Sequence, residues 1–519
     1  MIRLTGMNSG LDTDAMVKEL VSAYEKKGQK TKNAKTKFEW KQEIWTDLNK
    51  KIKSFNSKVK NMQYSSSYSQ KKTVSSNESK VSVIAGDKAV RGTQTIKVRS
   101  LAATGYLTSK NVNLDEDGNK VRNITGKSTL EELGITSESG SIAITVNGKD
   151  TIIAANKDTT IEQFVSKLNA TGVGVDASFD EKNGRFFISA EKSGKAADFS
   201  FSEVDADGNK TTGTSILSAM GLVGDGTSKI SGADAEIILN GATFTSNSNS
   251  FDINGMAISV KGLTERGVAA DGSFDDSKDE VLTLTTDVDT DAIYKNIKSL
   301  VSEYSKLMNE LSKLYNGPTA RKFEPLTDEE KDAMTDDEVE KWETKIKDSL
   351  LRRDESVASV MNAMKDSAMG TYVVNNKKYT LADFGIGTLG YFESADNEKS
   401  ALHISGDEDD DAVSGETNKL KQMITTDPDV VAGFFSKLMS DMSEKFNTLS
   451  RSSTSRSFGN FYDDKKVKEE MSSYEKKVTD FESYLADIED KYYKQFTRME
   501  TAMAKLNSTQ SQLGSYFGM

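Results

Sequence analysis

The chain has 519 residues, of which 36% are hydrophobic and 29% are charged, and its formal net charge is -12. This length exceeds one ordinary core, so we expect several domains, and the acidic balance argues against a nucleic-acid binder because phosphate neutralisation needs a basic surface. The absence of cysteine excludes disulfides and thiolate chemistry, and the single histidine, His403, leaves little room for imidazole-based catalysis.

No apolar run is long enough to span a bilayer, so we expect no membrane insertion. The N-terminal residues 1–6 lack the continuous apolar core of a secretory signal peptide. By these rules alone the protein would be cytoplasmic.

The N-terminal region predicts two helical stretches separated by a polar joint. Asp12 is a plausible N-cap for a helix whose apolar residues share one face, namely Met16, Val17, Leu20, Val21 and Tyr24. The basic stretch 26–37 has almost no apolar anchor, and we interpret it as a solvated, mobile joint. A heptad seam broken by one lysine then follows, made of Phe38, Lys41, Trp45, Leu48, Ile52, Phe55, Val59 and Met62.

The pattern of residues 95–286 is that of a β-rich head. Short apolar or alternating runs are separated by dipeptides that favour the positive backbone angles of tight hairpin turns. These dipeptides are Asp117-Gly118, Asn147-Gly148, Asn183-Gly184, Asp207-Gly208, Asn240-Gly241 and Asn254-Gly255. One helix is predicted among the strands, and it is opened by a Thr159-x-x-Glu162 capping box.

Helix returns near Asp291, and its apolar seam ends at Asn316-Gly317-Pro318, a combination that stops helices. Four further segments follow in chain order: an acidic helical segment over 327–353, a strand insertion over 372–404 with its turn at Asn375-Asn376, a helix over 430–449, and a flexible joint over 450–460.

The last segment holds the longest apolar seam of the chain. Its members alternate three and four residues apart, and they are Met471, Tyr474, Val478, Phe481, Leu485, Ile488, Tyr492, Gln495, Met499, Ala502 and Leu506. Isolated helices are marginal in water, so this stripe must be buried against a partner. The N-terminal heptad helix and a second copy of the chain are the two candidate partners.

We therefore expect an α+β multidomain protein with terminal α-helical coiled-coil legs, a helical-bundle domain and a β-rich head of two subdomains. The predicted boundaries are 1–42 with 468–519 for the leg, 43–95 with 286–467 for the helical-bundle domain and its small strand insertion, 96–136 with 235–285 for one head subdomain, and 137–234 for the second.

Acidic segments of the chain could suggest metal sites. A calcium loop through Glu203, Asp205 and Asp207 would need a bidentate glutamate where Thr214 stands, so a hairpin turn is favoured there. The cluster 407–411 is interpreted as a solvated loop rather than a metal site. No set of catalytic residues stands out, so we expect no enzyme, no cofactor and no metal, although abundant carboxylates leave a glycosidase pair open.

Motifs at both ends resemble one family. The opening Ser9-Gly10-Leu11-Asp12-Thr13-Asp14, followed by Met16-Val17 and a lysine-rich helix, resembles that of flagellar hook-associated protein 2, the filament cap family FliD. The ending 506–513 is similar to the family's C-terminal tail, and Phe251-Asp252-Ile253-Asn254-Gly255 resembles a motif of flagellar β domains. Pro325-Leu326-Thr327-Asp328 and the following helix with Trp342 look like a form found in Gram-positive relatives.

This resemblance implies an extracellular cap at the distal tip of the flagellum, exported through the flagellar type III channel without a cleaved signal peptide. That implication replaces the cytoplasmic expectation. The cap would promote insertion and polymerisation of exported flagellin and prevent its leakage. Implied partners are further copies of the chain, with a pentamer favoured, flagellin, hook–filament junction proteins, and an export chaperone before secretion.

We predict that the leg helices carry the oligomer and filament contacts. The candidate residues are Met16, Val17, Leu20, Trp45, Leu48, Ile52, Phe481, Leu485, Ile488, Met499 and Leu506. Two alternatives stay open: an adhesin that binds host mucin or glycans through the β-rich head, and a flagellin or hook–filament junction protein.

Overall fold

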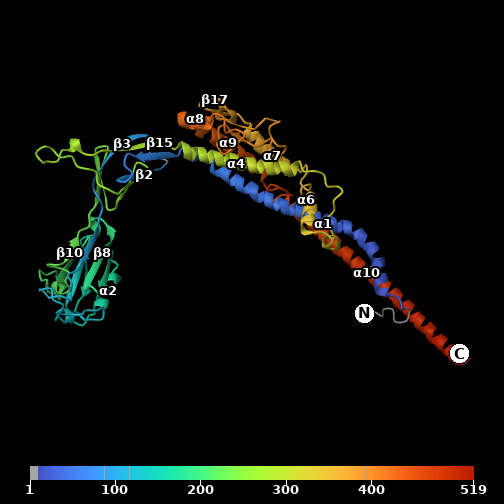
Figure 1. The fold of residues 1–519 in the computed structure, drawn as a ribbon, viewed down its shortest axis with the longest axis horizontal. Helices are drawn as coiled ribbons and strands as arrows, with labels where there is room; N and C mark the ends of the chain where they lie inside the picture. The colour runs from blue at the N-terminus through green and yellow to red at the C-terminus, as the bar shows by residue number, and fades with distance from the viewer. Residues whose placement is uncertain (1–9, 87, 116, 391, 519) are drawn as a thin grey trace. The chain divides into compact units, whose positions relative to one another are not determined.

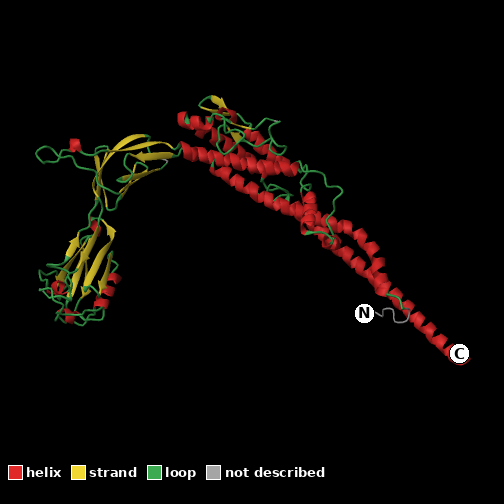
Figure 2. Cartoon of the chain, viewed as in Figure 1, coloured by secondary structure: helices red, strands yellow, loops and turns green. Residues whose placement is uncertain are grey.

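The computed structural model describes residues 10–86, 88–115, 117–390 and 392–518. The chain divides into two compact units. One, which we call the helical unit, combines the chain up to Ser69 with the chain from Thr290 onward, and the other, the β unit, runs from Gln70 to Asp289. Figures 1 and 2 show long helices in the first unit and most of the strands in the second, which confirms the predicted fold class. Ser9 and the start of the predicted leg lie outside the described residues.

The helical unit is built from segments at both ends of the chain. Its helices are α1 (Thr13–Asn61), α4 (Thr290–Tyr315), α5 (Asp328–Asp332), α6 (Asp336–Lys347), α7 (Glu355–Ala368), α8 (Lys419–Thr426), α9 (Pro428–Leu449) and α10 (Asp464–Phe517). Short elements connect them: η1 (Ser65–Tyr68), β16 (Tyr372–Val374), β17 (Lys377–Tyr379), η5 (Leu381–Phe384), β18 (Ile386–Gly387) and β19 (His403–Ile404).

Local sequence signals set several helix ends as predicted. The Asp12 carboxylate accepts a hydrogen bond of 3.0 Å from the backbone N–H of Ala15, which satisfies one of the free donors at the start of α1. Helix α4 ends at Tyr315, directly before Asn316-Gly317-Pro318. Between β16 and β17, Asn375 and Asn376 both have positive φ, as a two-residue hairpin turn requires.

The core of the helical unit is rich in aromatic side chains. Phe55 on α1 packs against Tyr304 on α4 and Phe446 on α9, with ring centroids 6.4 Å and 6.0 Å away. Phe434 and Phe435 of α9 are buried as well. The predicted seam of α4 faces this core, since its residues Ile293, Ile297, Leu300, Tyr304, Leu307 and Leu311 are all buried.

The predicted joint at residues 26–37 is wrong, because α1 runs through it without a break. Lysine and alanine favour helix intrinsically, and the lysines gain partners: Lys32 pairs with Glu482 at 3.2 Å and Lys35 with Glu39 at 2.5 Å. Figure 1 shows that the helix axis curves along this part of α1.

Residues 450–460 lie outside any helix, as predicted, but they are tied down rather than loose. The Gly459 N–H donates to the Ser450 carbonyl at 2.8 Å, and Arg456 pairs with Asp463 at 3.0 Å. Phe461 is buried, and its N–H donates to the Asn49 side chain at 3.0 Å. The prediction of a flexible joint overlooked these contacts, which come from both sides of the loop.

The β unit holds two hydrophobic cores, each between two antiparallel sheets. The first lies between the sheet β1-β15-β3-β11-β12 and the sheet β13-β14-β2. Their bounds are β1 (Lys71–Ser75), β2 (Val81–Ala85), β3 (Gly92–Ser100), β11 (Ala235–Leu239), β12 (Ala242–Ser246), β13 (Ser250–Ile253), β14 (Met256–Val260) and β15 (Leu282–Val288). The predicted Asn240-Gly241 and Asn254-Gly255 turns are confirmed, with positive φ at all four residues.

The second core lies between the sheets β10-β4-β8-β7 and β6-β5-β9. These elements, with two helices, are β4 (Thr104–Thr108), β5 (Ser141–Val146), β6 (Lys149–Ala154), α2 (Ile161–Ala170), β7 (Val175–Asp180), β8 (Arg185–Ser193), β9 (Phe199–Val204), α3 (Ser215–Ala219) and β10 (Ser228–Ile230). Short turns of 3-10 helix are η2 (Leu130–Leu133), η3 (Lys195–Ala197) and η4 (Asp276–Lys278). The capping box of α2 uses Thr160 and Gln163, one residue later than predicted, because the Thr159 hydroxyl donates to Asn156 instead, at 2.6 Å.

The structure differs from the predicted domain boundaries at two places in the chain. Strands begin at Lys71, inside the stretch 43–95 that we assigned to the helical bundle, and their partners β15 and β14 lie far away in sequence. Buried residues from Leu107 to Ile135 share the second core of the β unit, although we assigned 96–136 to the other subdomain. With these differences, we keep the division into leg, bundle and two head subdomains as a proposal.

Candidate functional site: the terminal helices

Helices α1 and α10 lie antiparallel and side by side in the segment that we call the leg, residues 13–42 and 464–517, and the C-terminal end of α10 continues beyond the start of α1 (Figure 1). Ring contacts fix their register: Phe38 meets Tyr474 at 5.6 Å between centroids, and Tyr24 meets Tyr484 at 6.3 Å. Just beyond the leg, Trp45 stacks on Tyr462 at 5.1 Å. Much of each apolar seam therefore has the other as a partner within one chain, while Ala502 and Leu506 near the end of the α10 seam are exposed.

A glycine lets the two helices approach closely. Gly28 is buried, and a Cβ atom placed on it would lie 1.9 Å from the Phe481 ring. The ring therefore occupies the space that any side chain at position 28 would need. Glycine weakens a helix interior by roughly 1 kcal/mol, so this fit offsets an intrinsic cost.

Tyrosines add a polar contact to the same seam. A hydrogen bond with Tyr24 raises the pKa of the Tyr492 hydroxyl, because that bond favours the protonated form. The two helices are thus joined by rings, by Lys32–Glu482, and by this hydroxyl pair.

The structure places the predicted contact residues in three environments. Fully buried against the chain's own helices are Val17, Trp45, Leu48 and Ile52. Half-buried along α10 are Phe481, Leu485, Ile488 and Met499. Exposed are Met16, Leu20 and Leu506, of which Leu506 has 68% of its surface in solvent. Contact of these residues with another molecule stays a prediction.

The N-terminal seam differs from the predicted one. Val17 and Val21 are buried, whereas Met16 and Leu20 are exposed to solvent, so these residues do not share one face. The inward set runs Thr13, Val17, Val21, Tyr24 and Gly28, with spacings of four and three. Sequence reasoning missed Thr13 and Gly28 because neither is a large apolar residue.

We call the exposed apolar residues of the leg, which include Met16, Leu20 and Leu506, its outer stripe. Sequence reasoning also missed Leu11 and Leu513, which are 45% and 51% exposed. Leu513 repeats the helical spacing of the predicted set, since it follows Leu506 by seven residues, whereas Leu11 lies before the start of α1. Exposed apolar side chains on a helix are suited to packing against further helices.

The acidic residues that could have suggested a calcium loop, Glu203 and Asp205, accept hydrogen bonds from their own chain. Glu203 is buried and accepts hydrogen bonds from the backbone at the start of α3, including one of 3.1 Å from Leu217. Asp205 closes its hairpin turn by accepting from Asn209 at 2.8 Å, which supports the turn interpretation. Among the described residues, no three His, Cys, Asp or Glu side chains are grouped as metal ligands.

The lone histidine contacts a carboxylate beside an ion-pair network. His403 Nδ1 lies 2.6 Å from an Asp410 oxygen. Beside it, Lys298 binds both Asp407 and Asp409. Burial lowers the pKa of Lys298, but these two carboxylates outweigh it, and the net pKa is raised.

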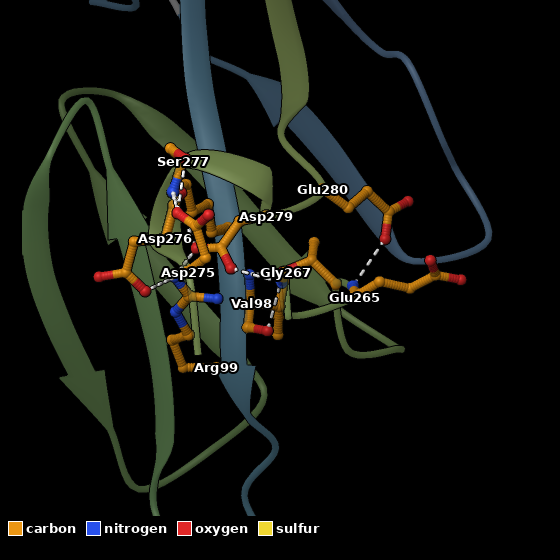
Figure 3. A network of polar contacts seen from close by, with 11 residues as sticks. Val98, Arg99, Glu265, Gly267, Asp275, Asp276, Ser277, Asp279 and Glu280 are labelled. Carbon is orange, nitrogen blue, oxygen red and sulfur yellow. Dashed lines mark hydrogen bonds and ion pairs between the residues drawn. The ribbon is translucent and has the colours of Figure 1, made fainter. Parts of the chain in front are cut away.

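A second polar network anchors the long loop 261–281 of the β unit (Figure 3). Asp279 is almost fully buried, and its carboxylate accepts from Arg99, from Lys97 at 2.9 Å and from the Gly267 N–H at 2.9 Å. Thr264 brackets Val98 by bonding both its N–H and its carbonyl. The loop is thus fastened to β3 at its base.

We expect Asp279→Asn to weaken this anchor in a pH-dependent way. Arg99, followed by Lys97 and the Gly267 N–H, lowers the pKa of Asp279 below its ordinary 3.8. Because the pKa of Asp279 is lower in the folded state than its ordinary value of 3.8, the charged carboxylate stabilises the fold above pH 3.8. This stabilisation is lost progressively as the pH falls from 3.8 through the folded-state pKa. Hydrogen exchange in 261–281 should therefore be faster in the variant at neutral pH and should converge with the wild type in acid.

Asp271→Asn is the matched control, because Asp271 lies in the same loop but is exposed, and within the described part of the chain its carboxylate accepts hydrogen bonds from Ser273. Equal exchange rates in Asp279→Asn and the wild type at neutral pH would contradict the anchoring role.

No described helix is long and apolar enough to cross a membrane. The two ends of this chain form one helical leg with an outward apolar stripe, and its middle forms a separate β unit. That combination is typical of an assembly protein.

Comparison with known proteins gives the family. Residues 232–508, more than half of the chain, match the family model "Flagellar hook-associated protein 2 C-terminus", and residues 9–105 match "Flagellar hook-associated protein 2 N-terminus". The chain belongs to the flagellar hook-associated protein 2 family.

Similar proteins share this description. Flagellar hook-associated protein 2 of Halalkalibacterium halodurans is 24% identical over 99% of this chain and 100% of its own length, in agreement with the resemblance to Gram-positive relatives. The Thermotoga maritima protein is 23% identical over 61% of this chain and 45% of its own. Among solved structures, the D1-D2-D3 domains of the Escherichia coli flagellar cap protein FliD are 17% identical with a TM-score of 0.47, covering 79% of this chain and 97% of that one.

Proposed function

We propose that this chain caps the distal tip of the bacterial flagellar filament, outside the cell. It promotes the insertion and polymerisation of exported flagellin and prevents flagellin from leaking away. The observation that carries the proposal is the leg, which lies in a chain whose two ends both match the flagellar hook-associated protein 2 family.

The leg is suited to this work for a physical reason. Its inner seam is satisfied within the chain by contacts such as Phe38–Tyr474, so the helix pair is a preformed element. Its outer stripe, including Met16, Leu20 and Leu506, is exposed to solvent. Burying each such large apolar side chain contributes roughly 1.5–3 kcal/mol before entropy is subtracted, which favours packing against helices of flagellin or of neighbouring copies.

The finer parts of the proposal come from the family resemblance. The working form is a homo-oligomer, with a pentamer favoured. Hook–filament junction proteins and an export chaperone are its other partners, and it leaves the cell without a cleaved signal peptide. The role is structural, with no catalytic step.

Deleting residues 1–37 together with 470–519 is expected to abolish capping. The deletion removes the outer stripe and most of the inner seam. The remaining chain would therefore lack the pair of leg helices that holds the filament end. The measurement is filament length together with the amount of monomeric flagellin in the medium, in cells that express only the variant. We expect short or absent filaments and abundant free flagellin.

Deleting residues 104–230 is the matched control, because it removes the second core of the β unit and leaves the leg intact. Normal filaments in the leg deletion would rule out capping through the leg. The adhesin alternative predicts instead that the 104–230 deletion loses mucin binding while filaments grow normally, and no contact among the described residues favours it.

A further inference from the structure

A groove on α1 is lined by three lysines, of which one is paired with a carboxylate that also borders the groove. It has a volume of about 540 Å³ and is bordered by Lys26, Gln29, Lys30, Asn33, Lys37 and Glu324. Residues 26 to 38 contain six lysines and no acidic residue. Among the residues that the structure describes, Lys26, Lys27 and Lys30 form no ion pair, whereas Lys32, Lys35 and Lys37 each form one.

The groove lies on the side of α1 that faces away from α10. Its α1 members recur three and four residues apart, so they share one helix face. Lys26 and Lys30 each stand two residues from Gly28, which meets Phe481, and a two-residue step turns a helix by about 200°. The groove therefore stays accessible to another molecule while α1 is packed against α10.

One end of the groove already receives a carboxylate. Glu324 accepts from Lys37 at 2.8 Å and from Asn33 at 3.3 Å, and Gln29 donates to Asn33 at 2.8 Å, so the amides are aligned toward that acid. At the other end of the groove, Lys26 and Lys30 also supply ammonium groups, but no described carboxylate pairs with them. A segment that carries carboxylates would therefore fit this end.

The chain itself carries such a segment. Helices α5 and α6 hold eight carboxylates between Asp328 and Glu340 against the single Lys331, and all eight are exposed. Glu330 and Glu338 cap their own helices. The other six, which are Asp328, Glu329, Asp332, Asp336, Asp337 and Glu340, form no ion pair among the described residues.

We propose that the acidic segment 328–340 of one copy docks into the lysine groove of a second copy. The occupant is a second copy because the same chain presents two unlike surfaces of opposite charge. A contact between unlike surfaces is head-to-tail, and it closes into a ring when the rotation permits. The proposal rests on the oligomeric cap proposed above and names one of its subunit contacts.

The absence of cysteine makes the test specific. Full-length Lys30→Cys and full-length Asp337→Cys are mixed and oxidised, and we expect a disulfide-linked dimer from the mixture that neither variant gives alone. Lys345→Cys replaces Asp337→Cys as the control, because Lys345 lies at the far end of α6. A dimer that is no more abundant with Asp337→Cys than with Lys345→Cys would overturn the proposal.

Charge reversal gives a second, independent readout. Lys26→Glu with Lys30→Glu should raise the protein concentration needed for self-assembly by at least about tenfold, measured by sedimentation at low salt, because attraction becomes repulsion. Adding Asp336→Lys and Asp337→Lys to the same chain should restore assembly, and high salt should weaken the wild type. A reversal that leaves assembly unchanged, or that the second pair fails to rescue, would refute the docking.

Three outcomes distinguish docking between copies from the alternative explanations. Efficient intramolecular cross-linking of Lys30→Cys/Asp337→Cys in dilute monomer would show that the chain fills its own groove, and the inference would be wrong. Capped filaments without any cross-link would also defeat it while leaving capping intact. A reversal that stops filament growth without changing self-assembly would assign the groove to flagellin, again against the inference.

Discussion

Trp45→Asp is expected to lower the free energy of unfolding of the helical unit by at least about 3 kcal/mol. Trp45 is only 2% exposed and stacks on Tyr462 with the two rings 7° from parallel. The substitution removes this packing and leaves a carboxylate in an apolar site without a partner. Trp40 and Trp342 stay in the same unit, so denaturant titration followed by tryptophan fluorescence reports its unfolding alone.

Trp45→Phe is the control, since it keeps an aromatic ring and adds no charge. We expect Leu485→Asp to cost less in the single chain, because Leu485 is only half-buried, yet to disrupt the leg and its assembly. If helicity and oligomerisation were unchanged in both aspartate variants, the placement of these residues in the leg and its base would be mistaken.

Gly28→Leu is expected to separate α1 from α10 at the middle of the leg. The Phe481 ring must leave the space over position 28, where even a Cβ atom would lie 1.9 Å from it. Overfilling a packed site costs about 1–3 kcal/mol, more than the roughly 1 kcal/mol that a helix gains on losing a glycine. Hydrogen exchange of residues 13–28 and 475–500 should therefore become faster.

Gly514→Leu is the matched control within α10, because no atom lies within 4 Å of a Cβ placed there. That substitution should slow exchange, since only the helix preference changes. Phe481→Ala should then reverse the effect of Gly28→Leu by making room for the leucine. Faster exchange in Gly28→Leu that Phe481→Ala does not reduce would mean that the clash is not the cause.

Local signals in the sequence were sufficient for many elements of the fold. The Asp12 cap, the Asn-Gly turns and the stop at Asn316-Gly317-Pro318 depend on backbone preferences of a few adjacent residues. The apolar seams of α4 and α10 follow from spacing alone. Such signals identify an element and one of its faces, because side-chain direction in a helix or strand follows directly from the period.

Errors occurred where the structure depends on distant partners. Strand β1 pairs with β15, so Lys71 lies opposite Val288, and the five-residue segment by itself has too little pattern to predict a strand. The stretch 26–37 looked like a break because it lacks apolar residues. It stays helical because lysine and alanine favour helix and because Glu482 and Glu324 reach its lysines from elsewhere in the chain.

The leg shows the division most clearly. The sequence by itself determined that both ends are helical and carry apolar seams, because periodic apolar residues suffice for that. Only the tertiary structure decided that Val17 and Val21 turn inward while Met16 and Leu20 stay outside, and that Gly28 receives Phe481. The physical reason is register: spacing defines a helix face, but the partner helix decides which face is buried and how closely it approaches.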